Sequence, residues 1–240
     1  MANTIKTALV TGANKGIGRE IAGQLAGLGY RVWLGCRDIQ RAETAAREMR
    51  QTIGDVRVLR LDVADGDSVM RAAAALAGET RRLDVLVNNA GIALDAQLPP
   101  SAVDMALLKS TYEVNVFGPV RVTQAFLPLL RAAPAARIVM MSSGAGALAK
   151  LSDPSFATNL LAYSSSKTAL NAVTLAFARE FRNTPIKINA ANPGHVATDL
   201  NGHAGPLSVA EGAAVAIRLA TLGADGPTGG FFNAAGPEPW

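Results

Sequence analysis

The sequence has little cysteine, little histidine and few charged residues, and each shortage excludes a class of protein. Cys36 is the one cysteine in 240 residues, so neither an internal disulfide framework nor a cysteine cluster for zinc can form. The two histidines, His195 and His203, lack further ligands of the right type close by, so we expect no metal site. No apolar run is long enough to span a bilayer, and residues 1–12 lack the basic and apolar parts of a signal peptide. We therefore expect a soluble, cytoplasmic protein with no membrane partner.

The balance of charged and apolar residues is that of a folded chain. Charged residues make up 18% and hydrophobic residues 49%, which excludes a disordered protein. The net charge is +4, but lysine and arginine are not massed into a tail, so we expect no nucleic-acid partner. A chain of 240 residues can bury a sizeable core, and α/β folds of this length commonly form one domain. We expect residues 1–240 to form a single domain.

Short apolar stretches rich in Val, Ile and Leu alternate along the chain with Ala-rich amphipathic stretches. Strands are predicted at 7–11, 31–35, 56–60, 84–88, 137–141, 187–192 and 230–233. Helices are predicted at 17–28, 38–51, 67–78, 103–116, 119–132, 160–182 and 208–222. This alternation predicts an α/β, Rossmann-type, doubly wound fold whose seven-stranded parallel sheet carries helices on both faces. Ligands of such sheets bind outside the carboxyl ends of the strands.

A glycine-rich segment, Thr11–Gly18, joins the first predicted strand to the first predicted helix. Gly12 permits a tight turn, Gly16 lets the backbone approach a pyrophosphate, and Gly18 lets the helix pack closely on the strand. The N-terminus of the helix offers unpaired N–H groups to a phosphate. The spacing is G-x-x-x-G-x-G rather than the G-x-G-x-x-G of the dinucleotide fingerprint, so an ordinary strand-to-helix turn is the alternative.

Tyr163 and Lys167 lie four residues apart in a predicted helix, so both side chains share one face. An ammonium beside a phenol favours the phenolate and lowers the pKa of the tyrosine from its usual value of about 10. Such a phenol can donate a proton to a carbonyl oxygen or accept one from an alcohol. Because this spacing also arises by chance, the pair gains weight from the polar residues at the strand ends.

Polar or glycine clusters follow several predicted strands at the same rim of the sheet. Asp62 follows the third strand, Asn88–Gly91 ends the fourth, Ser142 and Ser143 follow the fifth, and Pro193–Thr198 follows the sixth. Asn115 lies inside the helical stretch after the fourth strand, where asparagine is mildly unfavourable and so indicates a specific role.

Taken in order, these motifs resemble the short-chain dehydrogenase/reductase family, in its compact single-domain branch. The matching pieces are Thr11–Gly18, Asn88-Asn89-Ala90-Gly91, Asn115, Ser143, Tyr163 with Lys167, and Pro193-Gly194. The resemblance extends from Thr11 to Trp240. The glycine loop, Cys36-Arg37-Asp38 and the segment around Gly229-Gly230-Phe231 are similar to NADPH-dependent carbonyl reductases in particular.

The resemblance implies a role for each catalytic residue. Tyr163 would donate the proton in ketone reduction, and Lys167 would hydrogen-bond the nicotinamide ribose and lower the pKa of Tyr163. Ser143 would hydrogen-bond the substrate carbonyl, and Asn115 would shape the active-site helix and hold water in a proton relay. Strand alternation sends Ser142 and Ser143 to opposite sides, and the family pattern selects Ser143. Ser164, Ser165 and Ser166 are expected to pack or face solvent, and His195 to make backbone contacts.

Charge at the end of the second strand favours NADPH over NADH. An NAD site needs a carboxylate there for the ribose 2′-OH, but Cys36 is neutral and Arg37 follows it. Lys15 can reach the same region, and two cations suit a 2′-phosphate. Asp38 is expected to cap the next helix instead.

The resemblance also implies contacts to the adenine, the nicotinamide and the pyrophosphate. The expected cofactor-binding residues are Gly12, Asn14, Lys15, Gly16, Ile17, Gly18, Arg37, Asp62, Val63, Asn89, Ala90, Gly91, Tyr163, Lys167, Pro193, Gly194, Val196 and Thr198.

The sequence thus predicts an NADPH-dependent oxidoreductase that reduces a ketone or an aldehyde of a small molecule. An NAD(P)-dependent alcohol dehydrogenase working oxidatively is one alternative, and a non-catalytic dinucleotide-binding sensor is another. A segment of added length, Ala147–Leu161, separates Ser143 from Tyr163, so a dimer, a tetramer and a monomer all stay open. The lid segment Thr198–Pro206 is short and rich in Gly and Ala, which favours an open site for bulky ketones.

Overall fold

Seven parallel strands form the sheet predicted from the sequence. The structure is a computed structural model that describes residues 5–96 and 98–240. The strands are β1 (Thr7–Thr11), β2 (Arg31–Cys36), β3 (Val56–Arg60), β4 (Val85–Asn88), β5 (Arg137–Met141), β6 (Lys187–Ala191) and β7 (Phe231–Phe232). Their order across the sheet is β3-β2-β1-β4-β5-β6-β7, and every neighbouring pair is parallel. The predicted bounds differ from these by one residue at most.

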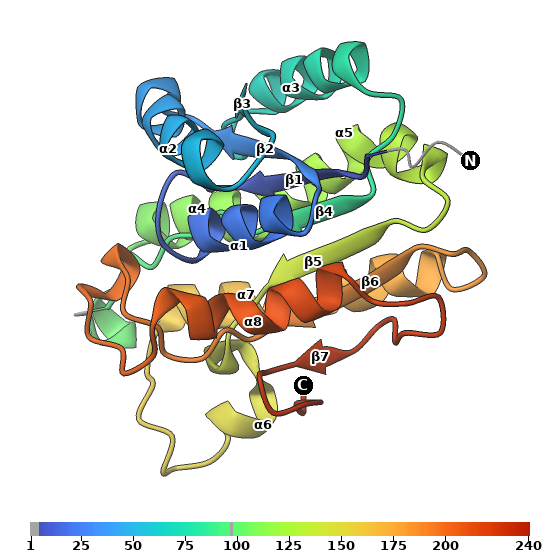
Figure 1. Cartoon of the computed structure of the whole chain (residues 1–240). Helices are drawn as coiled ribbons and strands as arrows, with labels where there is room; N and C mark the ends of the chain where they lie inside the picture. The colour runs from blue at the N-terminus through green and yellow to red at the C-terminus, as the bar shows by residue number, and fades with distance from the viewer. Residues whose placement is uncertain (1–4, 97) are drawn as a thin grey trace.

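Helices cover both faces of this sheet (Figure 1). They are α1 (Gly16–Gly27), α2 (Ile39–Thr52), α3 (Gly66–Glu79), α4 (Met105–Tyr112), α5 (Gly118–Ala132), α6 (Leu148–Leu151), α7 (Leu161–Glu180) and α8 (Val209–Ala220). Short turns are η1 (Pro100–Ala102), η2 (Glu113–Phe117), η3 (Gly144–Gly146) and η4 (Asp199–Asn201). No helix in the described ranges is both long and apolar enough to cross a membrane.

Two apolar cores lie on opposite sides of the sheet because strand side chains alternate. Ala8 and Val10 of β1 pack into the core that α1, α2 and α8 complete. Leu9, between them, packs into the core that α3, α5 and α7 complete. Burial on both faces explains why the inner strands β1, β4 and β5 are nearly continuous apolar runs, whereas the edge strand β3 contains Arg57 and Arg60.

The long helical stretch between β4 and β5 differs from the prediction. Two helices were expected at 103–116 and 119–132, whereas α4, η2 and α5 follow one another without a break, and η2 is a π-helical turn. Pro119 lies in the first turn of α5 and has no N–H to give to the carbonyl of Asn115, four residues earlier. The wider turn carries the helix past this proline, and it contains Asn115.

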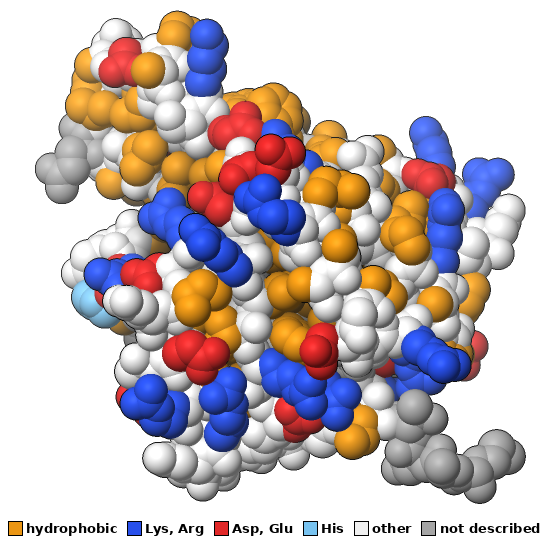
Figure 2. Space-filling view, turned by 90° about the horizontal axis from the view of Figure 1, so that it is seen from above, with side chains coloured by type: hydrophobic (Ala, Val, Ile, Leu, Met, Phe, Trp, Pro, Cys, Tyr) orange, Lys and Arg blue, Asp and Glu red, His pale blue; other side chains and the backbone are white. Residues whose placement is uncertain are grey.

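Arginines around α2 and α3 are mostly paired with carboxylates. Figure 2 shows Lys and Arg side chains interleaved with Asp and Glu on this face of the molecule. Arg57 Nη1 lies 2.9 Å from Glu79, and Arg50 Nη1 lies 3.4 Å from Glu43. This mixed charge is typical of a solvated surface.

Candidate active site

The ends of β1 and β4 are joined by hydrogen bonds at the point where the strand order reverses. Thr11 Oγ1 accepts from the backbone N–H groups of Asn89 (2.9 Å) and Ala90 (3.0 Å). Asn89 Nδ2 donates to the carbonyl oxygen of Thr11 at 2.8 Å. These bonds hold the glycine loop against Asn89-Ala90-Gly91, so both segments line the crevice where doubly wound sheets bind ligands.

The glycine loop has the geometry of a phosphate cradle. Gly12 has φ of +65°, a conformation that a side chain would strain. A Cβ at Gly18 would lie 2.3 Å from Asn89 Nδ2, so the close approach of α1 to the loop after β4 requires glycine. The residue before α1, Lys15, gives the helix no side-chain cap in the described structure. The first N–H groups of α1 therefore face the crevice and suit an anion.

A cavity of about 470 Å³ occupies this crevice. The predicted residues that line it are Gly12, Asn14, Lys15, Gly16, Ile17, Gly18, Arg37, Asp62, Val63, Asn89, Ala90, Gly91, Tyr163, Lys167, Pro193 and Thr198. Within the described part of the chain, the predicted site residues Asn115, Ser143, Gly194 and Val196 lie outside this lining. Val196 is buried and packs on α8 instead, where a Cβ at Gly212 would lie 2.4 Å from its methyl group.

Eleven residues that line this cavity were not predicted from the sequence. The further lining residues are Gly35, Cys36, Leu61, Ile92, Ala93, Leu94, Val114, Met141, Ser142, Asp199 and Leu200. Most are apolar residues next to predicted site residues, so adjacency to a motif is the signal that could have found them.

The end of β2 carries no negative charge at the cavity. Burial raises the pKa of the Cys36 thiol to about 11, so it is neutral at physiological pH. Asp38 Oδ1 accepts from Arg41 N at 3.1 Å and caps α2, as predicted. Arg37 is exposed, lines the cavity and forms no ion pair among the described residues.

Lys15 lines the same cavity as Arg37 and pairs there with a carboxylate. Its Nζ lies 2.5 Å from Asp199 Oδ2, at the start of the lid segment. Asp199 also accepts from His203 Nε2 at 2.9 Å. Lys15 and, after it, His203 lower the pKa of the Asp199 carboxyl, which therefore stays charged and holds the lysine.

Tyr163 and Lys167 both face the cavity from α7. Lys167 Nζ lies 5.6 Å from the centre of the Tyr163 ring, within cation–π range. The same ammonium donates to the carbonyl oxygen of Met141, at the end of β5, at 2.8 Å. Lys167 is 4% exposed, so this bond and the ring are its main compensation for lost water.

The direction of the Tyr163 pKa is opposite to the one predicted. Burial raises the pKa of Tyr163 above its usual value, and a hydrogen bond from Ser143 to the phenol opposes that rise without cancelling it. Burial also lowers the pKa of Lys167 to about 8. The protein therefore holds Tyr163 as a neutral phenol, a proton donor, at physiological pH.

The two serines after β5 have separate surroundings, as strand alternation predicted. Ser143 is half-buried; its Oγ accepts from Ala145 N at 3.1 Å and bonds the Tyr163 phenol. Ser142 is buried and donates to Asn171 Oδ1 of α7 at 2.5 Å. Ser143 is therefore the serine that bonds the Tyr163 phenol, whereas Ser142 lines the cavity and is tied to α7.

Asn115 ties the loop after β4 to α7. It is fully buried; its Oδ1 accepts from Ile92 N at 2.9 Å and its Nδ2 donates to Ile92 O at 2.8 Å. Nδ2 also donates to Ser166 Oγ at 3.0 Å, and Ser166 donates to the Tyr163 carbonyl at 2.7 Å. The side chain thus fixes the helix that carries Tyr163, and Ser166 has a specific partner rather than a mere packing role.

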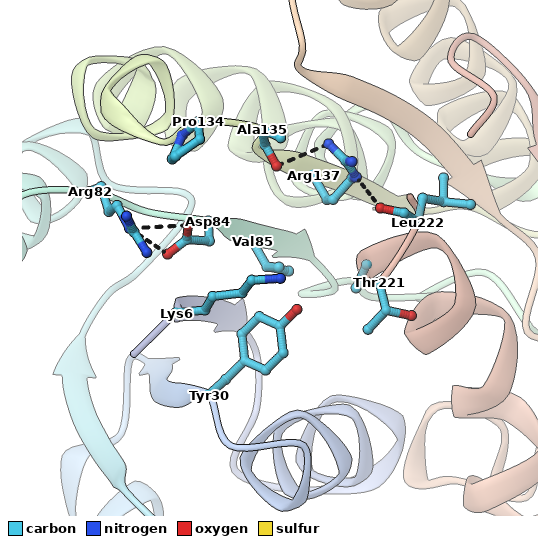
Figure 3. A pocket seen from close by; sticks show the side chains of 11 residues that line it. Lys6, Tyr30, Arg82, Asp84, Val85, Pro134, Ala135, Arg137, Thr221 and Leu222 are labelled. Carbon is cyan, nitrogen blue, oxygen red and sulfur yellow. Dashed lines mark hydrogen bonds and ion pairs between the residues drawn. The ribbon is translucent and has the colours of Figure 1, made fainter. Parts of the chain in front are cut away.

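A smaller cavity of about 150 Å³ lies at the opposite edge of the sheet, where the strands begin (Figure 3). Arg137 is 5% exposed and donates to the Leu222 carbonyl at 2.9 Å. Asp84 accepts from Thr7 N at 2.8 Å and from Arg82 Nε at 3.2 Å. These groups join chain segments, and no predicted site residue lines this cavity among those described, so the larger cavity is the candidate site. No group of three or more His, Cys, Asp or Glu in residues 5–96 and 98–240 could hold a metal ion.

Comparison with known proteins identifies the family. A family model described as short chain dehydrogenase matches residues 6–206. The chain belongs to the short-chain dehydrogenase/reductase family. Short-chain dehydrogenases/reductases bind a nicotinamide cofactor, which agrees with the glycine loop at the switch point.

Relatives of this short-chain dehydrogenase/reductase include reductases and dehydrogenases of small molecules. It is 33% identical to (-)-isopiperitenone reductase of Mentha piperita, over 97% of both chains. It is 37% identical to retinol dehydrogenase 14 of Homo sapiens, over 82% of this chain and 64% of that protein. Among solved structures, NADPH-bound carbonyl reductase from chicken fatty liver superposes with a TM-score of 0.87 at 30% identity, over 98% of this chain and 99% of that one.

Proposed function

We propose that this protein is an NADPH-dependent reductase that converts a ketone or an aldehyde to an alcohol. The observation that carries the proposal is that Tyr163, hydrogen-bonded by Ser143 and flanked by Lys167, faces the same cavity as the glycine loop. A proton donor and a dinucleotide cradle in one cavity are the two parts that carbonyl reduction needs.

The residues at both ends of the cavity fit a dinucleotide. The uncapped start of α1 and the close approach at Gly18 suit the pyrophosphate. Arg37 and the neutral Cys36 suit a 2′-phosphate and disfavour the 2′-OH pattern, which needs a carboxylate. A bound nicotinamide would supply the hydride.

The chain's own residues would supply orientation and the proton. Ser143 would turn its single O–H from the phenol to the substrate carbonyl and so set the carbonyl beside Tyr163. The neutral phenol of Tyr163 gives its proton to the carbonyl oxygen as negative charge develops there. The Lys167 ammonium, held by Met141 O, lies beside the ring and stabilises the phenolate that remains. Asn115 keeps α7, and with it Tyr163, in register with the loop after β4.

The wall near Tyr163 indicates an apolar substrate. Ile92, Leu94, Val114 and Leu200 line the cavity, and the side chains of Leu94 and Leu200 are also exposed at its rim. Burying such a rim under a bulky hydrocarbon part of a ketone is favourable. The names of the relatives, which include isopiperitenone and retinol, support the same substrate class.

The test is NADPH oxidation against a panel of aldehydes, aryl ketones, cyclic ketones and quinones, with the reverse reaction on the matching alcohols. We expect reduction with NADPH, and we expect Tyr163→Phe to lower kcat about 10²–10⁴-fold while NADPH still binds. Tyr112→Phe is the matched control because Tyr112 lies on α4, beside Phe117. Turnover that survives in Tyr163→Phe contradicts the role of the phenol, and turnover of alcohols only would favour the oxidative alternative.

A further inference from the structure

Near the C-terminus, Glu238 is a buried carboxylate. Its side chain is 1% exposed. A buried carboxylate is unfavourable unless charged or polar partners surround it. Glu238 has two: its Oε1 forms an ion pair with Lys150 of α6, and its Oε2 accepts from Asn192 Nδ2 at 2.7 Å. All three side chains lie at the carboxyl-end rim of the sheet.

The Asn192 amide connects Glu238 to the turn after β6. Its Nδ2 faces Glu238, which leaves Oδ1 to accept from Gly194 N at 3.0 Å. Gly194 has φ of +79°, so this turn is tight, and its other member, Pro193, lines the cavity. The carboxylate thus fixes which end of the amide points to the turn.

The same cluster supports the segment that carries Ser143. A Cβ at Gly144 would lie 3.0 Å from Asn192 Nδ2, 3.3 Å from Lys150 Nζ and 3.6 Å from Glu238 Oε1. Gly144 directly follows Ser143, the serine that bonds the Tyr163 phenol. The charged cluster therefore packs against the backbone next to the predicted catalytic serine.

The last residues hold this cluster in place from outside. Trp240 stacks on Phe231 of β7, with 5.4 Å between ring centres, and its carbonyl accepts from Ala149 N of α6 at 3.1 Å. Figure 1 shows α6 beside the C-terminus, at the edge of the sheet. The tail, α6 and the turn after β6 thus meet at Glu238.

We propose that Glu238 is a positioning residue of the active site, a role that rests on the proposed function. Through Asn192 it orients the Pro193-Gly194 turn on the cofactor side of the cavity. Through Lys150 and Gly144 it supports the segment that presents Ser143 to Tyr163. It acts on the reacting groups through these residues and does not contact them.

The test exchanges donor and acceptor across the Glu238–Asn192 hydrogen bond. In Asn192→Asp, the new carboxylate and that of Glu238 repel each other and neither can donate a hydrogen bond. The second carboxylate oxygen at position 192 can still accept from Gly194 N. Adding Glu238→Gln supplies an amide donor, so the double variant re-forms the bond in the reverse direction. We expect Asn192→Asp to lower kcat/KM for a ketone and the affinity for NADPH, each about tenfold, and the double variant to recover to within about threefold of wild type.

The unfolding midpoint is measured in parallel to separate positioning from a merely structural role. A structural role would lower the midpoint and leave kcat per folded molecule unchanged. A lower midpoint with unchanged kcat, or a double variant no better than Asn192→Asp, overturns the proposal. If Asn192→Asp does not fold, Glu238→Gln alone decides. It keeps an acceptor for Asn192 but loses the ion pair, so we expect kcat to fall about threefold, against no change in the surface control Glu180→Gln. Unchanged kcat in Glu238→Gln overturns the proposal.

The failure of the proposed function would be seen separately, as wild-type protein that reduces no carbonyl. NADPH affinity then decides the role of Glu238: loss in Asn192→Asp and recovery in the double variant support it, and equal affinity in all three proteins overturns it.

Discussion

Arg37 carries the positive charge that distinguishes the two nicotinamide cofactors in the proposed function. It lines the cavity and forms no ion pair among the described residues, whereas Lys15 pairs with Asp199, so Arg37 can meet a 2′-phosphate without first losing a carboxylate partner. A hydrogen bond to a charged group contributes about 1.5–3 kcal/mol, so we expect Arg37→Ala to weaken NADPH binding at least about tenfold and to leave NADH binding unchanged. Titration of each cofactor into the protein measures both affinities.

Arg41→Ala is the control for this prediction, because Arg41 lies on α2, four residues along the chain, and pairs with Asp38. An equal loss of affinity for both cofactors in Arg37→Ala would show that the Arg37 side chain does not bind the 2′-phosphate of NADPH.

Lys167 makes stability depend on pH. Its pKa is about 8 in the folded protein and near 10.5 in the unfolded chain. Between these values the unfolded chain binds a proton that the folded protein does not, so this group's contribution to stability rises with pH. The contribution is full above the unfolded pKa and is lost as pH falls through the folded one.

We therefore expect the difference in unfolding free energy between wild type and Lys167→Met to shift in favour of wild type as pH rises from about 7.5 to about 10. Urea denaturation of both proteins at several pH values measures it, and other titrating groups cancel in the difference. A difference that is flat with pH would mean that Lys167 keeps its ordinary pKa.

At the scale of elements, the side-chain amide of Asn115 hydrogen-bonds the π turn η2 to the loop after β4 and to α7. Asn115→Ala removes the partners of the Ile92 N–H and carbonyl groups and of Ser166 Oγ. A buried polar group without a partner costs about 1–3 kcal/mol, so we expect a loss of stability of at least that size. Denaturant unfolding measures it, with the exposed Asn183→Ala as control. If Asn115→Ala lost no more unfolding free energy than the control, the stabilising role of the Asn115 amide would be contradicted.

The elements that the sequence predicted well are those with a local signal. Most strands are short apolar runs, and Asp38 capping α2 is an interaction within four residues, so both were predictable. The π turn has no such signal: Gly118-Pro119 reads as a break, and the helix continues only because the turn before it widens.

Contacts between distant residues left no trace in the sequence. Lys15 and Asp199 are 184 residues apart, so their pairing followed from the tertiary fold and not from either motif. Glu238 and Asn192 are 46 residues apart, and nothing in the spacing marked the glutamate as buried. The predicted direction of the Tyr163 pKa was wrong for a related reason. The prediction rests on Lys167, four residues along the chain, whereas the burial that raises the pKa is a property of the whole fold.

At the scale of the whole molecule, Arg137 connects three chain segments at the end of the sheet opposite the active site. Its guanidinium donates to the carbonyl groups of Ala135, Ala136, Pro185, Leu222 and Gly223. We expect Arg137→Met to lower stability by at least about 2 kcal/mol because these carbonyls lose their donor. Activity per folded molecule should not change, since the cavity near Tyr163 lies at the other end of the strands. Denaturant unfolding and specific activity measure the two effects, and Arg71→Met, a change of an exposed side chain, is the control.

The order of strands in the sheet sets when the cofactor crevice can exist during synthesis. β1 pairs with β2, which follows closely, but also with β4, where Ala8 aligns with Val85. Until β4 has left the ribosome, one side of β1 has no partner, and the glycine loop has neither Asn89 nor Ala90 against it. The junction of β1 and β4 can therefore form before Tyr163 is made, whereas the cluster around Glu238 needs residues 231–240. Pairings of such long sequence separation fold slowly, so the nascent chain spends part of its synthesis with an exposed apolar strand edge, a stage at which chaperones have something to bind.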